Sequence, residues 1–376
     1  MRSTEVKPFP LIEISGRPLE RGRSYGSQAK DRIRKTLDHY KAQVGRLELD
    51  AATIAEVIRA VTPAVRNFDA NYLDEMRGIA EGAGVSFEDI FFVNARTEIL
   101  RLAMRPELRA RLLKRDAPDG CTAVTVMPSA TKNGELIHAQ NWDWKVECSQ
   151  TGVVLRIRRE DGPDILTYTE AGMMARSGFN SAGIAITGNN LESDCDYTQT
   201  GVPLPMIRRK ALECTHVAVA MHTVYTTPKS ASNNMAVSHC DGIAINFECA
   251  PSETFMLNPE SGLLVHSNHW LSPVALGKLK DTGVAMSPCS LYRHSRVREL
   301  LTPLLGSITA DSVKKALLDD MQSPWSVCRP PRLDPARNIQ TATVATVVMQ
   351  PRAGIMEVAN LAAVNPEFTV YHLSPR

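Results

Sequence analysis

A cysteine preceded by a glycine lies where the character of the chain changes. Cys121 follows Asp119 and Gly120 and begins CTAVTVM, whose alternating small, polar and β-branched residues are typical of a strand. A thiolate is a strong nucleophile, and glycine permits backbone conformations that other residues resist. The thiol could therefore attack its own preceding carbonyl, and hydrolysis would free the α-amine of Cys121. That amine, with a pKa of ~8, could then serve the thiol as a general base.

The spacing alone makes Cys121 a weak candidate, because a lone cysteine is usually a small buried hydrophobic residue. No two cysteines form a CxxC pair, so neither a zinc knuckle nor a thioredoxin-type motif is predicted. We expect reduced thiols in an intracellular compartment. The eight cysteines are Cys121, Cys148, Cys195, Cys214, Cys240, Cys249, Cys289 and Cys328.

The elements that must position Cys121 differ on its two sides. Residues 17–46 are charged and periodic, and residues 51–68 place apolar side chains at helical spacing. Ser86 resembles a helix N-cap, with Asp89 at the third position of the helix. The basic stretch of residues 101–115 is interpreted as a solvated helix face and linker. The pattern predicts a helical segment that ends at Gly120.

Strand signals dominate after residue 120. Asn133-Gly134 and Asp161-Gly162 predict two hairpin turns, and residues 183–187, 341–349 and 354–360 are typical of strands. Helical periodicity returns in residues 203–225 and 308–321. We therefore expect residues 1–120 to form a helical segment and residues 121–376 to form an α+β core.

Composition excludes several classes of protein. The chain is 43% hydrophobic and 22% charged with a net charge of +2, which favours a globular protein without a nucleic-acid or membrane partner. The sequence contains no run of ~18 apolar residues, so no transmembrane helix is predicted. The first residues lack the apolar region of a secretory signal, and the Leu373-Ser374-Pro375-Arg376 end does not match a peroxisomal signal, so we expect a cytoplasmic protein. Neither a P-loop nor GxGxxG occurs.

Longer motifs resemble one known family. DGCTAVTV and NGELIHAQNWDW, within residues 119–144, are similar to the acyl-coenzyme A:isopenicillin N acyltransferase family, peptidase family C45. The resemblance continues, in order, through TEAGMMARSGFNSAGIAIT (169–187), TGVP (200–203), HSNH (266–269) and WSVCR (325–329), and includes Gly16, Gly22 and Gly26. It implies the N-terminal nucleophile hydrolase fold, a four-layer αββα sandwich, here with a helical N-terminal segment.

The resemblance also implies roles for particular residues. Cys121 matches the family nucleophile, and the Gly120–Cys121 bond matches its self-cleavage site. Asp143 matches an acidic residue that orients the surroundings of the nucleophile. Asn268 matches a side chain of the oxyanion hole, where an amide N–H is worth ~3–4 kcal/mol of the barrier. Arg329 matches an arginine beside the nucleophile that could pair with Asp143 and favour a thiolate.

Each of these positions has a simpler interpretation when it is taken alone. Asp143 could cap a turn after a strand, and Asn268 and Arg329 could be surface residues. Asn190 lies where related choloylglycine hydrolases also carry an asparagine, so it could contact the oxyanion or the substrate, although this match is looser.

Two further pairs of residues invite interpretation. His266 and His269 form His-x-x-His, a weak metal signal without a carboxylate or thiol partner, so structural histidines are favoured and no metal is expected. Trp142 and Trp144 are interpreted as packing groups, one of which could line an acyl pocket.

We therefore expect a self-processing enzyme whose two fragments remain an αβ heterodimer, with the possibility of further pairing. Cys121 would take an acyl group from an amide or an acyl-coenzyme A thioester and pass it to an amine or to water. The partners would be a small-molecule acyl donor and an amine acceptor, and no cofactor is expected beyond coenzyme A as part of a substrate. One alternative is a pure amidohydrolase of N-acylated small molecules, and another is a non-catalytic binding protein of the same fold. The sequence does not identify the donor or the acceptor.

Overall fold

The computed structural model describes residues 6–46, 49–102, 120–334 and 338–373. The basic stretch expected as a linker lies largely outside these ranges. Helices dominate the first described part of the chain, as the periodicity predicts, and Ser86 caps α4 by accepting a hydrogen bond from the Asp89 N–H. These helices are α1 (Pro18–Gln28), α2 (Lys30–Arg46), α3 (Ala51–Ala83), α4 (Phe87–Asn94) and α5 (Arg96–Leu102).

One strand, which was not predicted from the sequence, precedes these helices. β1 (Leu11–Ile14) pairs in parallel with β4 (Gly152–Ile157), with Leu11 opposite Val154. β1 contributes an edge strand to a sheet whose other strands all come from beyond residue 120. The N-terminal segment is thus joined to the core by backbone pairing as well as by helix packing.

The strands form two sheets, and both predicted hairpins are present. The first sheet has the order β1-β4-β5-β6-β7-β8-β9-β10. Its remaining strands are β5 (Ile165–Glu170), β6 (Ser177–Asn180), β7 (Ile184–Asn190), β8 (Asn233–His239), β9 (Ile243–Cys249) and β10 (Thr254–Leu257). The second sheet has the order β11-β2-β3-β13-β14-β15, with β12 paired to β13. Its strands are β2 (Gly120–Val126), β3 (Ile137–Lys145), β11 (Leu263–His266), β12 (Arg332–Asp334), β13 (Ile339–Gln350), β14 (Ile355–Asn360) and β15 (Phe368–His372).

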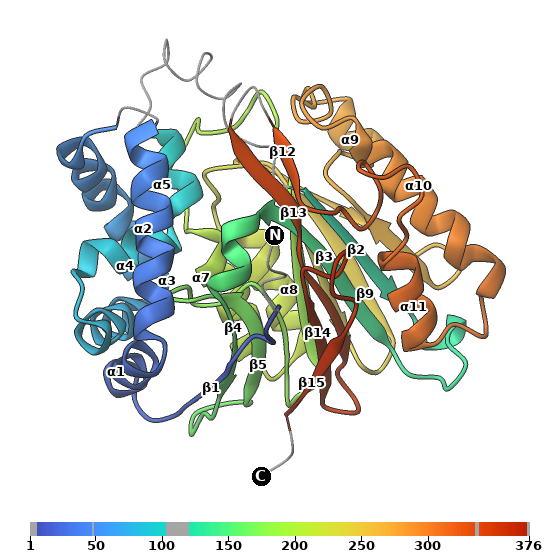
Figure 1. Cartoon of the computed structure of the whole chain (residues 1–376), viewed down its shortest axis with the longest axis horizontal. Helices are drawn as coiled ribbons and strands as arrows, with labels where there is room; N and C mark the ends of the chain where they lie inside the picture. The colour runs from blue at the N-terminus through green and yellow to red at the C-terminus, as the bar shows by residue number, and fades with distance from the viewer. Residues whose placement is uncertain (1–5, 47–48, 103–119, 335–337, 374–376) are drawn as a thin grey trace.

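Four layers result from the way the strand faces are buried. Val153 and Leu155 pack with the N-terminal helices, whereas Val154 between them packs with Val347 of the opposite sheet. The outer face of the second sheet packs against α10 (Cys289–Leu301) and α11 (Ala310–Leu317). Figure 1 shows the two sheets face to face between these two groups of helices. The αββα sandwich expected from the resemblance is confirmed.

The remaining helices complete the outer layers. α7 (Leu204–Glu213) and α8 (Val217–Thr226) lie in the predicted region 203–225 and join the core formed by the N-terminal helices. The short α9 (Pro273–Leu276) precedes α10. Within the described ranges no helix is both long enough and apolar enough to cross a membrane.

Candidate active site

Cys121 is the second residue of β2 and is fully buried. β2 pairs antiparallel with β3, which places Gly120 opposite Asp143 and Cys121 opposite Trp142. Asp143 therefore lies inside a strand, which excludes its interpretation as a cap of the turn after β3. The cross-strand register brings the proposed cleavage bond and this carboxylate together because both strands belong to one predicted hairpin.

Asn268 follows β11 and lies against the backbone of Cys121. The Cys121 N–H donates to Asn268 Oδ1 over 2.7 Å, and Asn268 Nδ2 donates to the Asn190 carbonyl over 2.9 Å. The side chain is therefore held at both ends, with its oxygen on the nitrogen of the Gly120–Cys121 bond. Asn268 is buried, so it is not the surface residue that its position alone would suggest.

Arg293 of α10 completes this arrangement, although no sequence motif indicated it. The guanidinium is fully buried and donates to the Cys121 carbonyl, to Thr122 Oγ1 over 2.7 Å and to Asn268 Oδ1 over 2.8 Å. Burial lowers the pKa of Arg293, and the neighbouring charge of Arg329 adds to this effect. The Asn268 oxygen thus accepts from two donors, which fixes the orientation of its amide.

Asp143 and Arg329 form a buried ion pair beside Gly120. Arg329 Nε lies 3.3 Å from Asp143 Oδ2, and Thr343 Oγ1 donates to Asp143 Oδ1 over 2.7 Å. The Arg329 backbone N–H donates to the same Thr343 hydroxyl over 2.7 Å. A Cβ atom at Gly120 would lie 2.8 Å from the Asp143 carboxylate and 2.9 Å from Arg329 Nη1. Gly120 therefore leaves the space that this pair occupies.

A second cysteine lies behind Arg329. Cys289 begins α10, and Arg329 Nη2 donates to its sulfur over 2.9 Å. Burial raises the pKa of the Cys289 thiol, but the charges of Arg329 and Arg293 outweigh that effect and hold the pKa below its ordinary value. Cys289 is a polarised thiol next to the site, at a position that no sequence motif indicated.

Arg176 reaches Cys121 from the other sheet. It immediately precedes β6, lies over the Trp142 ring at 4.1 Å and donates through Nη2 to Cys121 Sγ over 3.4 Å. Trp142 is buried, as expected of a packing group, and it supports this arginine. Trp144 is also buried and donates through its indole N–H to Tyr40 Oη over 3.3 Å.

The other candidate positions lie around this centre. Asn190 is the last residue of β7, and its contact with Asn268 is made through its backbone carbonyl. His266 is fully buried with Nε2 2.7 Å from Glu248, a carboxylate partner that the sequence did not reveal. His269 is hydrogen-bonded through Nδ1 to Ser290 Oγ over 2.7 Å. Burial and the neighbouring His266 lower the pKa of His269 to about 4, which favours the neutral ring.

Side chains of the kinds that bind metals also meet at a turn away from this centre. His239, Cys240 and Asp241 could each offer one ligand atom, within 4.8 Å of one another. Arg352 already pairs with Asp241 over 2.5 Å, and exposed groups of this kind are common without a metal.

Comparison with known proteins identifies the family. The model of the family described as acyl-coenzyme A:6-aminopenicillanic acid acyl-transferase matches residues 129–360, more than half of the chain. The chain belongs to this acyltransferase family. The matched range contains Asp143, Asn268 and Arg329 and begins after Cys121.

A curated relative of this chain matches most of its length. The acyl-coenzyme A:6-aminopenicillanic-acid-acyltransferase 40 kDa form of Emericella nidulans is 29% identical over 325 residues, which are 85% of this chain and 84% of the relative. Family membership supports an enzyme that handles acyl groups.

Three solved structures match this chain at lower sequence identity than the Emericella relative. A conjugated bile acid hydrolase from Clostridium perfringens is 13% identical with a TM-score of 0.46, and covers 67% of this chain and 92% of its own. The penicillin V acylase from Agrobacterium tumefaciens is 14% identical with a TM-score of 0.45, and covers 67% of this chain and 86% of its own. The N-acylethanolamine-hydrolyzing acid amidase ortholog of Caenorhabditis elegans is 15% identical with a TM-score of 0.42, and covers 61% of this chain and 93% of its own.

Proposed function

We propose that this acyltransferase-family chain is a self-processing enzyme that uses Cys121 twice. In the first reaction, Cys121 Sγ attacks the Gly120 carbonyl carbon, the C–N bond breaks, and a thioester forms while the freed amine takes a proton. Water then hydrolyses the thioester, which leaves a carboxylate on Gly120 and a free thiol and α-amine on Cys121. The observation that carries the proposal is the setting of this one peptide bond: Asn268, held by Arg293, accepts from its nitrogen, and the Asp143–Arg329 ion pair lies against Gly120.

The neighbouring residues would act on different atoms of the reacting bond. Asn268 Oδ1 accepts from the nitrogen that must leave, so the same oxygen could hold the α-amine after cleavage. An amide nitrogen carries two hydrogens, and one of those on Asn268 is given to Asn190. The second would be donated to the oxyanion of the tetrahedral intermediate. The Asp143 carboxylate would keep the new amine oriented and basic.

In the second reaction, the processed Cys121 would accept an acyl group as a thioester and pass it to an amine. The family description and the Emericella relative name acyl-coenzyme A and 6-aminopenicillanic acid, and we propose an acyl thioester as donor and an amine as acceptor for this chain as well. Hydrolysis of an amide passes through the same acyl-enzyme, with water as acceptor. Competition between water and an added amine distinguishes transfer from pure amide hydrolysis.

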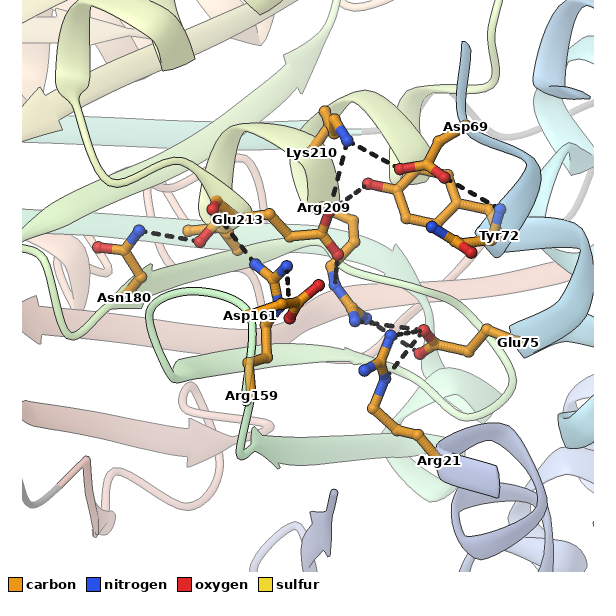
Figure 2. A network of polar contacts seen from close by, with 12 residues as sticks. Arg21, Asp69, Tyr72, Glu75, Arg159, Asp161, Asn180, Arg209, Lys210 and Glu213 are labelled. Atoms are coloured by element: carbon orange, nitrogen blue, oxygen red, sulfur yellow. Dashed lines mark hydrogen bonds and ion pairs between the residues drawn. The ribbon is translucent and has the colours of Figure 1, made fainter. Parts of the chain in front are cut away.

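The proposed fragments, residues 1–120 and 121–376, would remain together after cleavage. β1 pairs with β4 across the cleavage point. Glu75 of α3 also pairs with Arg209 of α7 over 3.2 Å, in the buried network drawn in Figure 2. The two fragments therefore share a sheet and a desolvated ion pair, which supports a stable αβ heterodimer.

Intact-mass analysis of the purified protein tests the proposal. We expect the wild-type chain to convert into two fragments that meet at Gly120–Cys121, and Cys121→Ala to remain whole. Cys195→Ala, which removes a partly exposed thiol elsewhere, serves as the matched control. An acyl donor should then add one acyl mass to the Cys121 fragment of the processed enzyme.

Two results would contradict this proposal. A wild-type chain that stays intact after prolonged incubation would exclude self-processing. A Cys121→Ala variant that retains the wild-type ligand affinity and biological role would instead support the non-catalytic binding protein.

A further inference from the structure

A buried arginine that no described carboxylate contacts lies beside the proposed nucleophile. Arg176 is only 6% exposed, and its Nε atom makes no hydrogen bond. In the ranges that the structure describes, its polar contact is the one to Cys121 Sγ, and no carboxylate pairs with it. Burying a cation costs several kcal/mol unless an anion is supplied, and besides the Cys121 sulfur no described side chain offers this guanidinium an anion.

The orientation of Arg176 is determined by its neighbours. Trp142 lies directly across the strand pair from Cys121, so the two side chains project from the same face. The guanidinium lies 4.1 Å from the Trp142 ring, which directs Nη2 towards the sulfur. An anion that approached Cys121 would therefore meet a cation that is already oriented.

Arg176 also lines a pocket whose wall carries further charged groups. The pocket wall includes Arg96, Arg208 and Glu98. Arg96 pairs with Glu170 over 3.3 Å, and Arg208 interacts electrostatically with Glu98. Asn189 and Asn190 contribute polar groups to the same wall. The pocket wall thus includes the Arg176 guanidinium, which pairs with no described carboxylate, next to polar amide groups.

We propose that Arg176 forms an anion subsite beside Cys121 that binds a carboxylate carried by the substrate within a few bonds of its scissile carbonyl. The planar guanidinium matches the geometry of a carboxylate, and such a pair is stronger in a desolvated site. The contact with Sγ requires the carboxylate to lie close to the reacting carbon. This inference rests on the proposed role of Cys121 as nucleophile and adds a substrate class to it.

Alkylation of Cys121 by two matched reagents tests the subsite without knowledge of the natural substrate. In each reaction the thiolate displaces iodide and forms one C–S bond, but iodoacetate carries a carboxylate where iodoacetamide carries a neutral amide. The rate of each reaction at Cys121 is measured by peptide mass analysis of the processed protein. We expect the iodoacetate-to-iodoacetamide ratio to fall roughly tenfold in Arg176→Gln, because a hydrogen bond to a charged group is lost.

Three controls accompany this measurement. Arg176→Lys keeps the charge and should retain part of the preference for iodoacetate. Arg352→Gln removes an exposed arginine that pairs with Asp241, and its ratio should equal that of the wild type. Cys195, which lies beside Asp194, gives an internal ratio that should not change among the variants.

The outcomes separate this inference from the proposed function. Equal slowing of both reagents in Arg176→Gln would mean that Arg176 acts on the thiolate alone, and this would overturn the subsite. A processed Cys121 that reacts with neither reagent would overturn it too, because the subsite must open onto Sγ. The masses of the same samples report self-cleavage, so a failure of the proposed function appears separately as an uncut chain.

Discussion

Gly120 is enclosed by the two groups of the Asp143–Arg329 ion pair. A methyl group there would lie 2.8 Å from the carboxylate and 2.9 Å from the guanidinium, so Gly120→Ala must push the pair away from the scissile bond. Overpacking of this kind costs ~1–3 kcal/mol, and we expect self-cleavage to slow about tenfold or more. The fraction of cut chain against time, from intact masses, measures this effect.

A control for this change is Gly277→Ala, where the added Cβ meets no atom closer than 3.4 Å. It should cleave at the wild-type rate. If Gly120→Ala cleaved itself at the wild-type rate, the ion pair would have room to move and its position would not be required for cleavage.

Glu98 is a buried carboxyl group whose ionisation opposes stability at neutral pH. Burial raises its pKa from 4.5 to about 7. Between these values the folded state holds a proton that the unfolded state has lost, so stability falls as the pH rises through this window. Glu98→Gln imitates the protonated form and accepts the same hydrogen bond from the Leu204 N–H. We expect its stability relative to the wild type to increase by about 3 kcal/mol from pH 4.5 to pH 7.

Urea unfolding of both proteins at pH 4.5, 6 and 8 checks this expectation, with the exposed Glu56→Gln as control. A difference between Glu98→Gln and the wild type that does not vary with pH would contradict it.

At the scale of elements, α1 and α3 approach each other closely because glycines of each helix face the backbone of the other. A Cβ at Gly78 of α3 would collide with the Leu19 carbonyl of α1 and lie 2.8 Å from the Arg23 nitrogen. Gly22 and Gly26 of α1 similarly face the backbone of α3. Gly78→Ala must separate the two helices, and we expect a loss of ~1–3 kcal/mol in the free energy of unfolding.

Denaturant unfolding measures this loss, and Gly45→Ala in α2 is the matched control because no atom lies within 4 Å of its added Cβ. The control should be neutral or more stable by up to about 1 kcal/mol, since alanine favours a helix. Equal stability of the two variants would show that the crossing tolerates a wider spacing.

At the scale of the whole molecule, buried ion pairs join the two proposed fragments. Glu75 is bound by Arg209 over 3.2 Å and by Arg21, whose Nε donates to it over 3.0 Å (Figure 2). Burial alone would raise the pKa of Glu75, but the charges of Arg209 and Arg21 outweigh it and hold the pKa below its ordinary value. This stabilisation is therefore complete above the ordinary carboxyl pKa and is lost as the pH falls through the lowered one.

Arg209→Met leaves Glu75 buried with one partner fewer, and we expect ~3 kcal/mol of destabilisation at pH 7. The penalty should shrink in acid as Glu75 takes up a proton. Unfolding of the processed protein, followed by size-exclusion analysis of its fragments, measures both effects. Arg23→Met removes the exposed Arg23–Glu81 pair between α1 and α3 and should cost less than about 1 kcal/mol. Equal penalties for the two variants would contradict a special role for the buried pair.

The local features of this protein were predictable from its sequence. Helical periodicity and turn residues located many of the elements, and the turn signal at Asn133-Gly134 predicted the hairpin whose strands carry Gly120 and Asp143. These features depend on neighbours in the chain, so spacing reveals them. The predicted helix of residues 51–68 ends where the non-helical backbone of Asp69 interrupts α3, and the second part of α3 continues to Ala83. The strand β1 escaped prediction because its pairing partner is far away in the sequence.

The surroundings of Cys121 were decided by the tertiary structure. Arg293 comes from α10, Thr343 from β13 and Arg176 from the edge of β6, and each reaches the site across a sheet or a layer. Arg176 lies within the TEAGMMARSGFN motif, so its position in a matching segment was the one signal available for it. The sequence by itself determined the candidate nucleophile, its family and the strand that carries it. The partners of the nucleophile and their charges depend on burial and on contacts between distant segments, and these exist only once the two sheets have packed.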